Sequence, residues 1–139
     1  MGYFKDAQEV YDTIGKLFTE LAADEELAPK FRQANTIVQY QHSDPDSTIT
    51  VRLREDEPTD VDFGETEMEP EVVMSMEADT AHRFWLGQVN VTTALARGQI
   101  KASGPVAKIL KLVPLTKPVY PRYQAQLEAD GREDLVNVD

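Results

Sequence analysis

Apolar residues recur at steps of three and four near the start of the chain, which is the spacing of one face of an α-helix. These positions fill about five helical turns and are Phe4, Ala7, Tyr11, Ile14, Phe18 and Leu21. The pattern predicts an amphipathic N-terminal helix whose apolar face covers a core.

Three segments that alternate between apolar and polar residues follow at 36–42, 48–54 and 59–63, with turn-forming residues between them. Such alternation predicts strands that are buried on one face. If Arg54 lies opposite Asp60 and Arg52 opposite Asp62 in the second hairpin, opposite charges pair on one face of the sheet. The same register pairs apolar residues on the other face. The pattern therefore predicts this antiparallel register.

A fourth alternating segment, 72–77, leads into two predicted short helices. Asp79 is a suitable N-cap for the first, which Gly87 would end, and Asn90 is a suitable N-cap for the second, which Gly98 would end. The sequence therefore predicts a strand followed by two capped helices.

A brief strand at 99–103 and a longer helix, opened by Gly104 and Pro105, complete this central region. Helical spacing groups four apolar residues of that helix into one stripe: Val106, Ile109, Leu110 and Val113. Three prolines between Pro114 and Pro121 then predict a bend, and the residues after Gly131 are expected to form a loose charged tail.

Composition fits one soluble domain, because the chain has 139 residues, of which 41% are hydrophobic and 28% charged. The domain is expected to span 1–139, with its core at about 4–130 and the loose tail at 131–139. The formal net charge of -11 argues against nucleic acid as a partner and against tight electrostatic docking on anionic lipid.

The chain is predicted to be cytoplasmic and not to insert stably into a membrane. It lacks cysteine, has no signal-peptide pattern at its start, and contains no apolar run near the ~20 residues of a membrane span. These features fit a cytoplasmic protein.

The segment from Glu55 to Glu71 contains nine acidic residues and no Lys or Arg. Asp60, Asp62 and Glu65 offer the hard oxygen ligands of a calcium site. Strand alternation directs such residues toward solvent, however, and the EF-hand spacing is absent. We expect a solvated outer face, no metal and no cofactor.

No catalytic motif stands out. Ser75, Asp79 and His82 offer the residue types of a hydrolytic triad, but the strand–turn–helix setting of a nucleophile elbow is missing. His42 and His82 have no metal-ligand spacing, and the glycines match neither a P-loop nor a dinucleotide fingerprint. The sequence predicts a protein that is not an enzyme.

The order of elements and three stretches of sequence resemble the sterol carrier protein 2 (SCP2) domain family, in its free-standing, acidic, prokaryotic type. The stretches are 72–79 (VVMSMEAD), 84–87 (FWLG) and, most specifically, 94–105 (ALARGQIKASGP). The last resembles the helix–Gly–strand–Gly–helix passage of that family.

The resemblance implies an α+β fold with a five-stranded, largely antiparallel sheet, helices on one face and an apolar tunnel. It also implies non-catalytic binding or transfer of a fatty acid, acyl-CoA, sterol-like molecule or other lipid. Residues expected to line the tunnel, from their faces and neighbourhood, are Phe18, Leu21, Val51, Met74, Phe84, Trp85, Leu95, Ile109, Leu110 and Val113.

Two other functions stay open at this point. One is an interaction module with a filled core that forms a homodimer through a strand edge or the proline-rich segment. The other is a small α+β enzyme, such as an isomerase or cyclase, that uses Asp79 and His82 in an apolar pocket.

Overall fold

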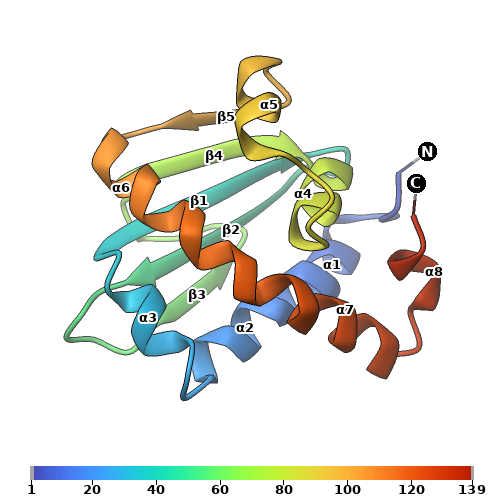
Figure 1. Cartoon of the computed structure of the whole chain (residues 1–139), viewed down its shortest axis with the longest axis horizontal. Coiled ribbons are helices and arrows are strands. Elements are labelled where there is room, and N and C mark those ends of the chain that lie inside the picture. The colour runs from blue at the N-terminus through green and yellow to red at the C-terminus, as the bar shows by residue number, and fades with distance from the viewer. Residues whose placement is uncertain (1, 139) are drawn as a thin grey trace.

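A computed structural model describes residues 2–138. The strands are β1 (Thr36–Ser43), β2 (Ser47–Leu53), β3 (Asp60–Phe63), β4 (Val72–Glu77) and β5 (Ile100–Ser103). They form one sheet in the order β3-β2-β1-β4-β5, in which β1 and β4 are parallel and the other neighbouring pairs are antiparallel. Helices cover one face of this sheet (Figure 1), so the predicted α+β architecture is confirmed.

The helices fall into three groups along the chain. The first comprises α1 (Ala7–Val10), the π-helical turn η1 (Tyr11–Gly15), α2 (Lys16–Ala23) and α3 (Ala28–Arg32). The second, between β4 and β5, comprises α4 (Ala78–Trp85) and α5 (Val91–Ala96). The third comprises α6 (Val106–Leu112), the 3₁₀ helix η2 (Val113–Val119), α7 (Tyr120–Ala129) and α8 (Glu133–Val136).

The predicted N-terminal helix is present, but a π-helical turn interrupts it. At this turn the Gln126 side chain of α7 donates a hydrogen bond to the Thr13 carbonyl (2.9 Å), and the Thr13 hydroxyl donates one to the Glu9 carbonyl (2.7 Å). Side chains therefore use carbonyl groups that the irregular turn leaves available. The buried Gly15 sits under the Phe63 ring, where an added Cβ would lie 2.8 Å from a ring carbon.

The predicted register of the second hairpin is wrong by two residues. Arg52 pairs with Asp60 and Val51 pairs with Val61, whereas Arg54 lies beyond β2 and forms an ion pair with Glu71 (3.3 Å). A shift of two residues keeps every side chain on its original face of the sheet. Both registers therefore satisfy the hydrophobic pattern, and the pattern could not distinguish them.

One of the two predicted helix caps is wrong. Helix α4 continues directly from β4 with Glu77 at its N-cap, and the Asp79 carboxylate accepts a hydrogen bond from the Tyr3 backbone N–H (2.9 Å). Asn90 caps α5 as predicted, because its side chain accepts a hydrogen bond from the Thr93 N–H (3.0 Å).

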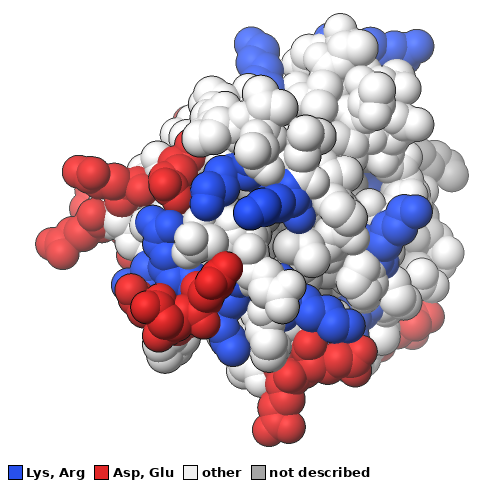
Figure 2. Space-filling view, turned by 60° about the vertical axis from the view of Figure 1, so that its left-hand side comes forward, with Lys and Arg blue, Asp and Glu red and all other residues white. Residues whose placement is uncertain are grey.

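Charge is unevenly distributed along the chain. Residues 80–127 contain no Asp or Glu, yet they contain half of the 14 Lys and Arg: Arg83, Arg97, Lys101, Lys108, Lys111, Lys117 and Arg122. Figure 2 shows red acidic side chains gathered along the left and lower margins of one face, while its upper right part is white and blue without red. The net charge of the whole chain therefore does not describe each surface.

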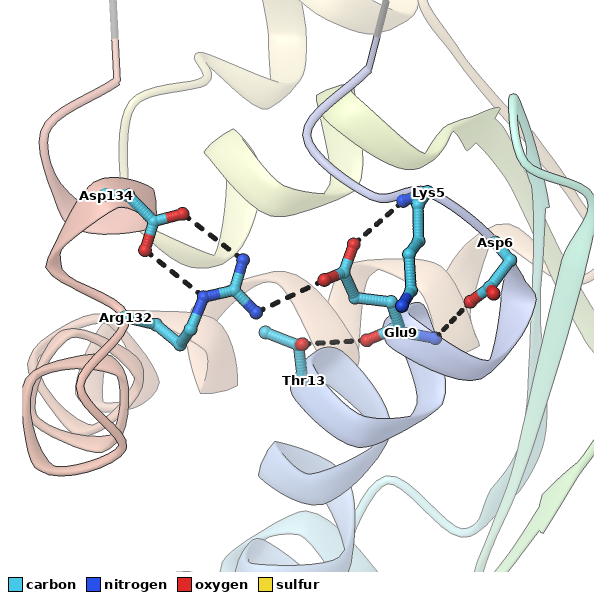
Figure 3. A network of polar contacts seen from close by, with 6 residues as sticks. All are labelled: Lys5, Asp6, Glu9, Thr13, Arg132 and Asp134. Atoms are coloured by element: carbon cyan, nitrogen blue, oxygen red, sulfur yellow. Dashed lines mark hydrogen bonds and ion pairs between the residues drawn. The ribbon is translucent and has the colours of Figure 1, made fainter.

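The C-terminal residues pack on the fold, although the sequence predicted a loose tail. Leu135 of α8 is only 3% exposed. The Arg132 guanidinium joins the Glu9 carboxylate (3.3 Å) to that of Asp134 (3.2 Å), as Figure 3 shows, and the Lys5 N–H also donates to Glu9 (2.8 Å). One buried leucine and this network hold α8 against the N-terminal residues.

Candidate ligand-binding site

A cavity of about 60 Å³ lies between the helix-covered face of the sheet and the helices α2, α3 and η2. Strands β1 and β2 form its floor, the carboxyl ends of α4 and α6 contribute one residue each, and η2 covers it. Its lining consists of Phe18, Leu21, Ala22, Ala28, Phe31, Val38, Tyr40, Val51, Leu53, Thr59, Trp85, Leu112, Leu115, Thr116 and Val119.

Three aromatic rings from three different elements form one wall of this cavity. Phe18 of α2 stacks on Tyr40 of β1, with ring centroids 5.1 Å apart and an angle of 23° between the planes. Trp85 of α4 meets Phe18 edge to face at 5.1 Å and Tyr40 at 6.0 Å. Such contacts hold rings in fixed orientations, so this wall is a rigid apolar surface.

No charged side chain lines the cavity, and its polar groups are few. The Thr116 hydroxyl donates to the Val113 carbonyl (2.8 Å). The buried Thr59 hydroxyl, by contrast, has no hydrogen-bond partner among residues 2–138. Burial raises the pKa of the Tyr40 hydroxyl, which therefore stays protonated and neutral. The Tyr40 hydroxyl also has no hydrogen-bond partner among the described residues, so the hydroxyls of Thr59 and Tyr40 are both available to a bound molecule.

The cover of the cavity is attached less firmly than its floor. Helix α6 contains no buried residue, and the following helix η2 contains Pro114 and Pro118. Leu112, Leu115 and Thr116 of this segment line the cavity while each stays partly exposed. Because Val119 is the one buried residue of these two helices, displacing this segment costs less than displacing α2 or α7, each of which buries three residues.

The structure brings four of the ten predicted lining residues to the cavity: Phe18, Leu21, Val51 and Trp85. Phe84 is buried behind them, with its ring 4.8 Å from Trp85, while Met74 and Ile109 pack as half-buried residues against the core. The other three, Leu95, Leu110 and Val113, are exposed by 38%, 65% and 38%.

Helix α6 explains most of this difference. Its predicted apolar stripe splits, so that Ile109 packs inward while Leu110 points outward. The side chain of Lys108 lies between α6 and the sheet and donates to the Asn35 carbonyl (2.6 Å). Because α6 is apolar around most of its circumference, periodicity alone could not determine which side faces the core.

Several lining residues were not singled out from the sequence, among them Phe31, Tyr40, Thr59, Leu112 and Leu115. Tyr40 stands on the alternating face of its strand together with Val38, so strand periodicity could have found it. Leu112 and Leu115 lie three residues apart beside Pro114, where the helix type changes and helical spacing becomes unreliable.

His82, which one alternative assigned to catalysis, is fully engaged inside the core and does not line the cavity. Its Nε2 donates to the Leu135 carbonyl (2.7 Å), and its Nδ1 accepts from the Tyr123 hydroxyl (2.8 Å). This assignment follows because a carbonyl can only accept and burial lowers the pKa of His82, which keeps the ring neutral. Both ring nitrogens therefore serve the packing of α7 and α8.

His42 is the second buried histidine. Its Nδ1 lies 3.2 Å from the Ser47 hydroxyl, and burial lowers the pKa of His42 to about 4. Within residues 2–138, no group of three His, Cys, Asp or Glu residues is placed to hold a metal ion. Across the same residues, no helix has the length and apolar character needed to cross a membrane.

The family model for the SCP-2 sterol transfer family matches residues 15–117, which is most of the chain. The chain belongs to this family. SCP2 domains bind or transfer lipids in general, and they are generally non-catalytic. A search of curated protein sequences returned no match.

Solved structures support the same fold. A sterol carrier protein domain 2 of Helicoverpa armigera has a TM-score of 0.67 at 15% identity, over 87% of this chain and 95% of that one. Sterol carrier protein 2 of Yarrowia lipolytica, in its apo form, gives 0.60 at 16%, over 82% and 91%.

The SCP2 fold also matches a small part of a longer protein. A sec-alkylsulfatase from a Pseudomonas species has a TM-score of 0.59 at 17% identity, over 75% of this chain but 16% of that one. At these identities the likeness supports the fold alone.

Proposed function

We propose that this protein binds a lipid non-covalently between the sheet and the α6–η2 segment and carries it between sites in the cell. The observation that carries the proposal is an uncharged cavity, walled by Phe18, Tyr40 and Trp85, beneath a helix that buries none of its own residues. Membership of the SCP2 family supports lipid binding in general.

The cavity must enlarge before it can hold such a molecule. Ligand sites in proteins enclose about 300–1,000 Å³, whereas this cavity encloses about 60 Å³. Outward movement of α6–η2 would separate Leu112 and Leu115 from the aromatic wall. A bound chain would cover those surfaces again, and burial of its own apolar area at about 25 cal/mol per Å² would offset the cost of opening.

The lining also limits the chemistry of the ligand. A carboxylate or phosphate inside this cavity would be desolvated without a cationic partner, which is strongly unfavourable. The apolar body of the ligand therefore lies inside, while any charged group stays at the rim. The hydroxyls of Thr59 and Tyr40 can hydrogen-bond to a neutral polar group such as a hydroxyl.

Trp85 permits a direct test because it is the one tryptophan of the chain and lines the cavity. Titration with cis-parinaric acid, a fluorescent fatty acid, should give saturable energy transfer from Trp85. Oleyl alcohol should compete at least as well as oleic acid, because the cavity itself holds no charged side chain.

A matched pair of variants distinguishes the cavity from the outer surface of α2. Ala22→Phe fills the cavity and should abolish energy transfer, whereas Ala23→Phe, at the exposed neighbouring position, should leave it unchanged. Equal binding by both variants, or no saturable transfer in the wild type, would contradict the proposal. The small cavity would then favour a ligand-free interaction module.

A further inference from the structure

Helix α6 presents an apolar face to solvent. Val106 and Leu110 of α6 are 68% and 65% exposed, and Val113, the first residue of η2, is 38% exposed. Val113 keeps α-helical backbone angles (φ -57°, ψ -50°), so the spacing of four and then three residues places the three side chains on one side of the segment. These three residues are called the α6 face below. An apolar face of this kind, repeated over two helical turns, marks a docking surface more often than single exposed residues do.

The surroundings of the α6 face are basic in a chain that is otherwise acidic. Lys111 and Lys117 are exposed and form no ion pair among residues 2–138. Residues 80–127 contain no acidic residue, and the carboxylate of Glu71, which interacts with Lys108 beside the amino end of α6, is already paired with Arg54. The net charge of -11 acts weakly at this surface, because salt screens charges beyond about 8 Å at physiological ionic strength.

We infer that α6 docks on the surface of an anionic lipid bilayer, with the α6 face in the interfacial region and Lys111 and Lys117 near the headgroups. Exposed apolar residues flanked by lysines are the chemistry of helices that lie on anionic membranes. The expectation from net charge, that anionic lipid is an unfavourable partner, therefore does not apply to this surface.

The position of α6 connects docking with the cavity. The inner side of the same segment contributes Leu112 and Leu115 to the cavity lining, while its outer side carries the α6 face. Docking would place the cover of the cavity in contact with the bilayer. The idea that lipid enters the cavity beside α6 rests on the proposed function, whereas the docking of α6 on a bilayer does not.

A second copy of this chain fits the α6 face less well. In a two-fold symmetric dimer the same patch faces itself, so Lys111 and Lys117 would approach the same lysines of the other copy. Docking of the α6 face on an acidic surface of another copy would be a heterologous contact, which generates a ring or an open filament rather than a two-fold dimer. A two-fold dimer opposes like charges, whereas an anionic leaflet opposes unlike ones.

The test is co-sedimentation with vesicles of phosphatidylcholine alone or of phosphatidylcholine mixed with phosphatidylglycerol. The full chain should bind the mixed vesicles and release on addition of salt. Lys111→Glu should weaken binding on the order of tenfold, since each basic residue near an anionic surface contributes roughly 1 kcal/mol. Leu110→Ser should weaken it by a similar factor, through lost apolar burial.

Lys5→Glu, which makes the same change of charge at an exposed N-terminal residue, should have a much smaller effect. Failure to bind mixed vesicles, or equal loss for Lys111→Glu and Lys5→Glu, would overturn the inference. So would a wild-type dimer that Leu110→Ser dissociates in analytical ultracentrifugation.

Binding of cis-parinaric acid, measured on the same samples, keeps the two proposals distinct. Variants that lose vesicle binding should retain energy transfer from Trp85. A wild type that transfers energy but does not bind mixed vesicles contradicts docking alone, whereas absent energy transfer in the wild type contradicts the proposed lipid binding.

Discussion

The two ends of the fold are built differently, although each is covered by helices from the C-terminal third of the chain. At one end, α4, α7 and α8 lie near both chain termini, and at the other α3 and α6 lie beside the opposite strand ends (Figure 1). Helix α7 buries Tyr123, Gln126 and Leu127, whereas α6 buries nothing. The first region is termed the closed end and the second the cavity end.

The buried ring and hydroxyl groups differ between the two ends. At the closed end, His82 uses both ring nitrogens, and Gln126 donates to the Thr13 carbonyl, although the Gln126 side-chain oxygen has no partner among residues 2–138. At the cavity end, neither the buried Thr59 hydroxyl nor the Tyr40 hydroxyl has a partner among the described residues. The His82 hydrogen bonds hold α7 and α8 in one arrangement, whereas the two hydroxyls of the cavity end stay available to a ligand.

The largest expected difference comes from the same substitution at both ends. Leu127→Ala removes a side chain that is 1% exposed and should lower the free energy of unfolding by about 3 kcal/mol. Leu110→Ala removes one that is 65% exposed and should change it by less than about 0.5 kcal/mol. Urea denaturation measures both. Similar losses would mean that α6 is as tightly packed as α7.

Acid should destabilise the protein through its buried histidines. Burial lowers the pKa of His42 to about 4 from 6.5, so between these pH values the unfolded chain binds a proton that the folded chain does not. The free energy of unfolding therefore falls as pH falls, by about 1.4 kcal/mol per unit for this group.

His42→Gln removes this contribution. Between pH 6.5 and pH 5 the wild type should lose about 1.6 kcal/mol more than the variant, as measured by urea denaturation at both pH values. If the wild type and His42→Gln lose the same free energy of unfolding between these pH values, His42 is protonated in the folded state.

A smaller effect should separate two tyrosines. Tyr123→Phe leaves Nδ1 of the buried His82 without a donor and should cost about 1 kcal/mol of folding free energy. Tyr40→Phe removes a hydroxyl that makes no hydrogen bond in the described chain, and should change stability by less than about 0.5 kcal/mol. If thermal or urea unfolding shows that both substitutions lower stability equally, the two tyrosine hydroxyls do not differ in hydrogen bonding.

Much of the fold could be predicted from the sequence, because local signals specify it. Alternation located the strands, Asn90 marked a cap, and glycines ended two helices, where Gly87 and Gly98 adopt positive φ angles of 82° and 74°. The register of the second hairpin could not be predicted, because registers two residues apart share one apolar pattern.

The site was less accessible to sequence reasoning. Phe18 and Trp85 stand in strongly patterned helices and were found, whereas Leu112 and Leu115 stand where an α-helix gives way to a 3₁₀ helix. Which side of α6 faces inward depends on tertiary contacts, such as the hydrogen bond from Lys108 to Asn35. No local pattern contains that information.

We expect the cavity end to accept a lipid while the closed end stays unchanged. Hydrogen–deuterium exchange with and without bound oleic acid can detect this difference, because exchange reports local opening along the chain. Protection should change in residues 106–119 and stay constant in 123–136. If oleic acid binds but leaves 106–119 unchanged, or alters 123–136 to the same degree, the two ends do not differ in this way.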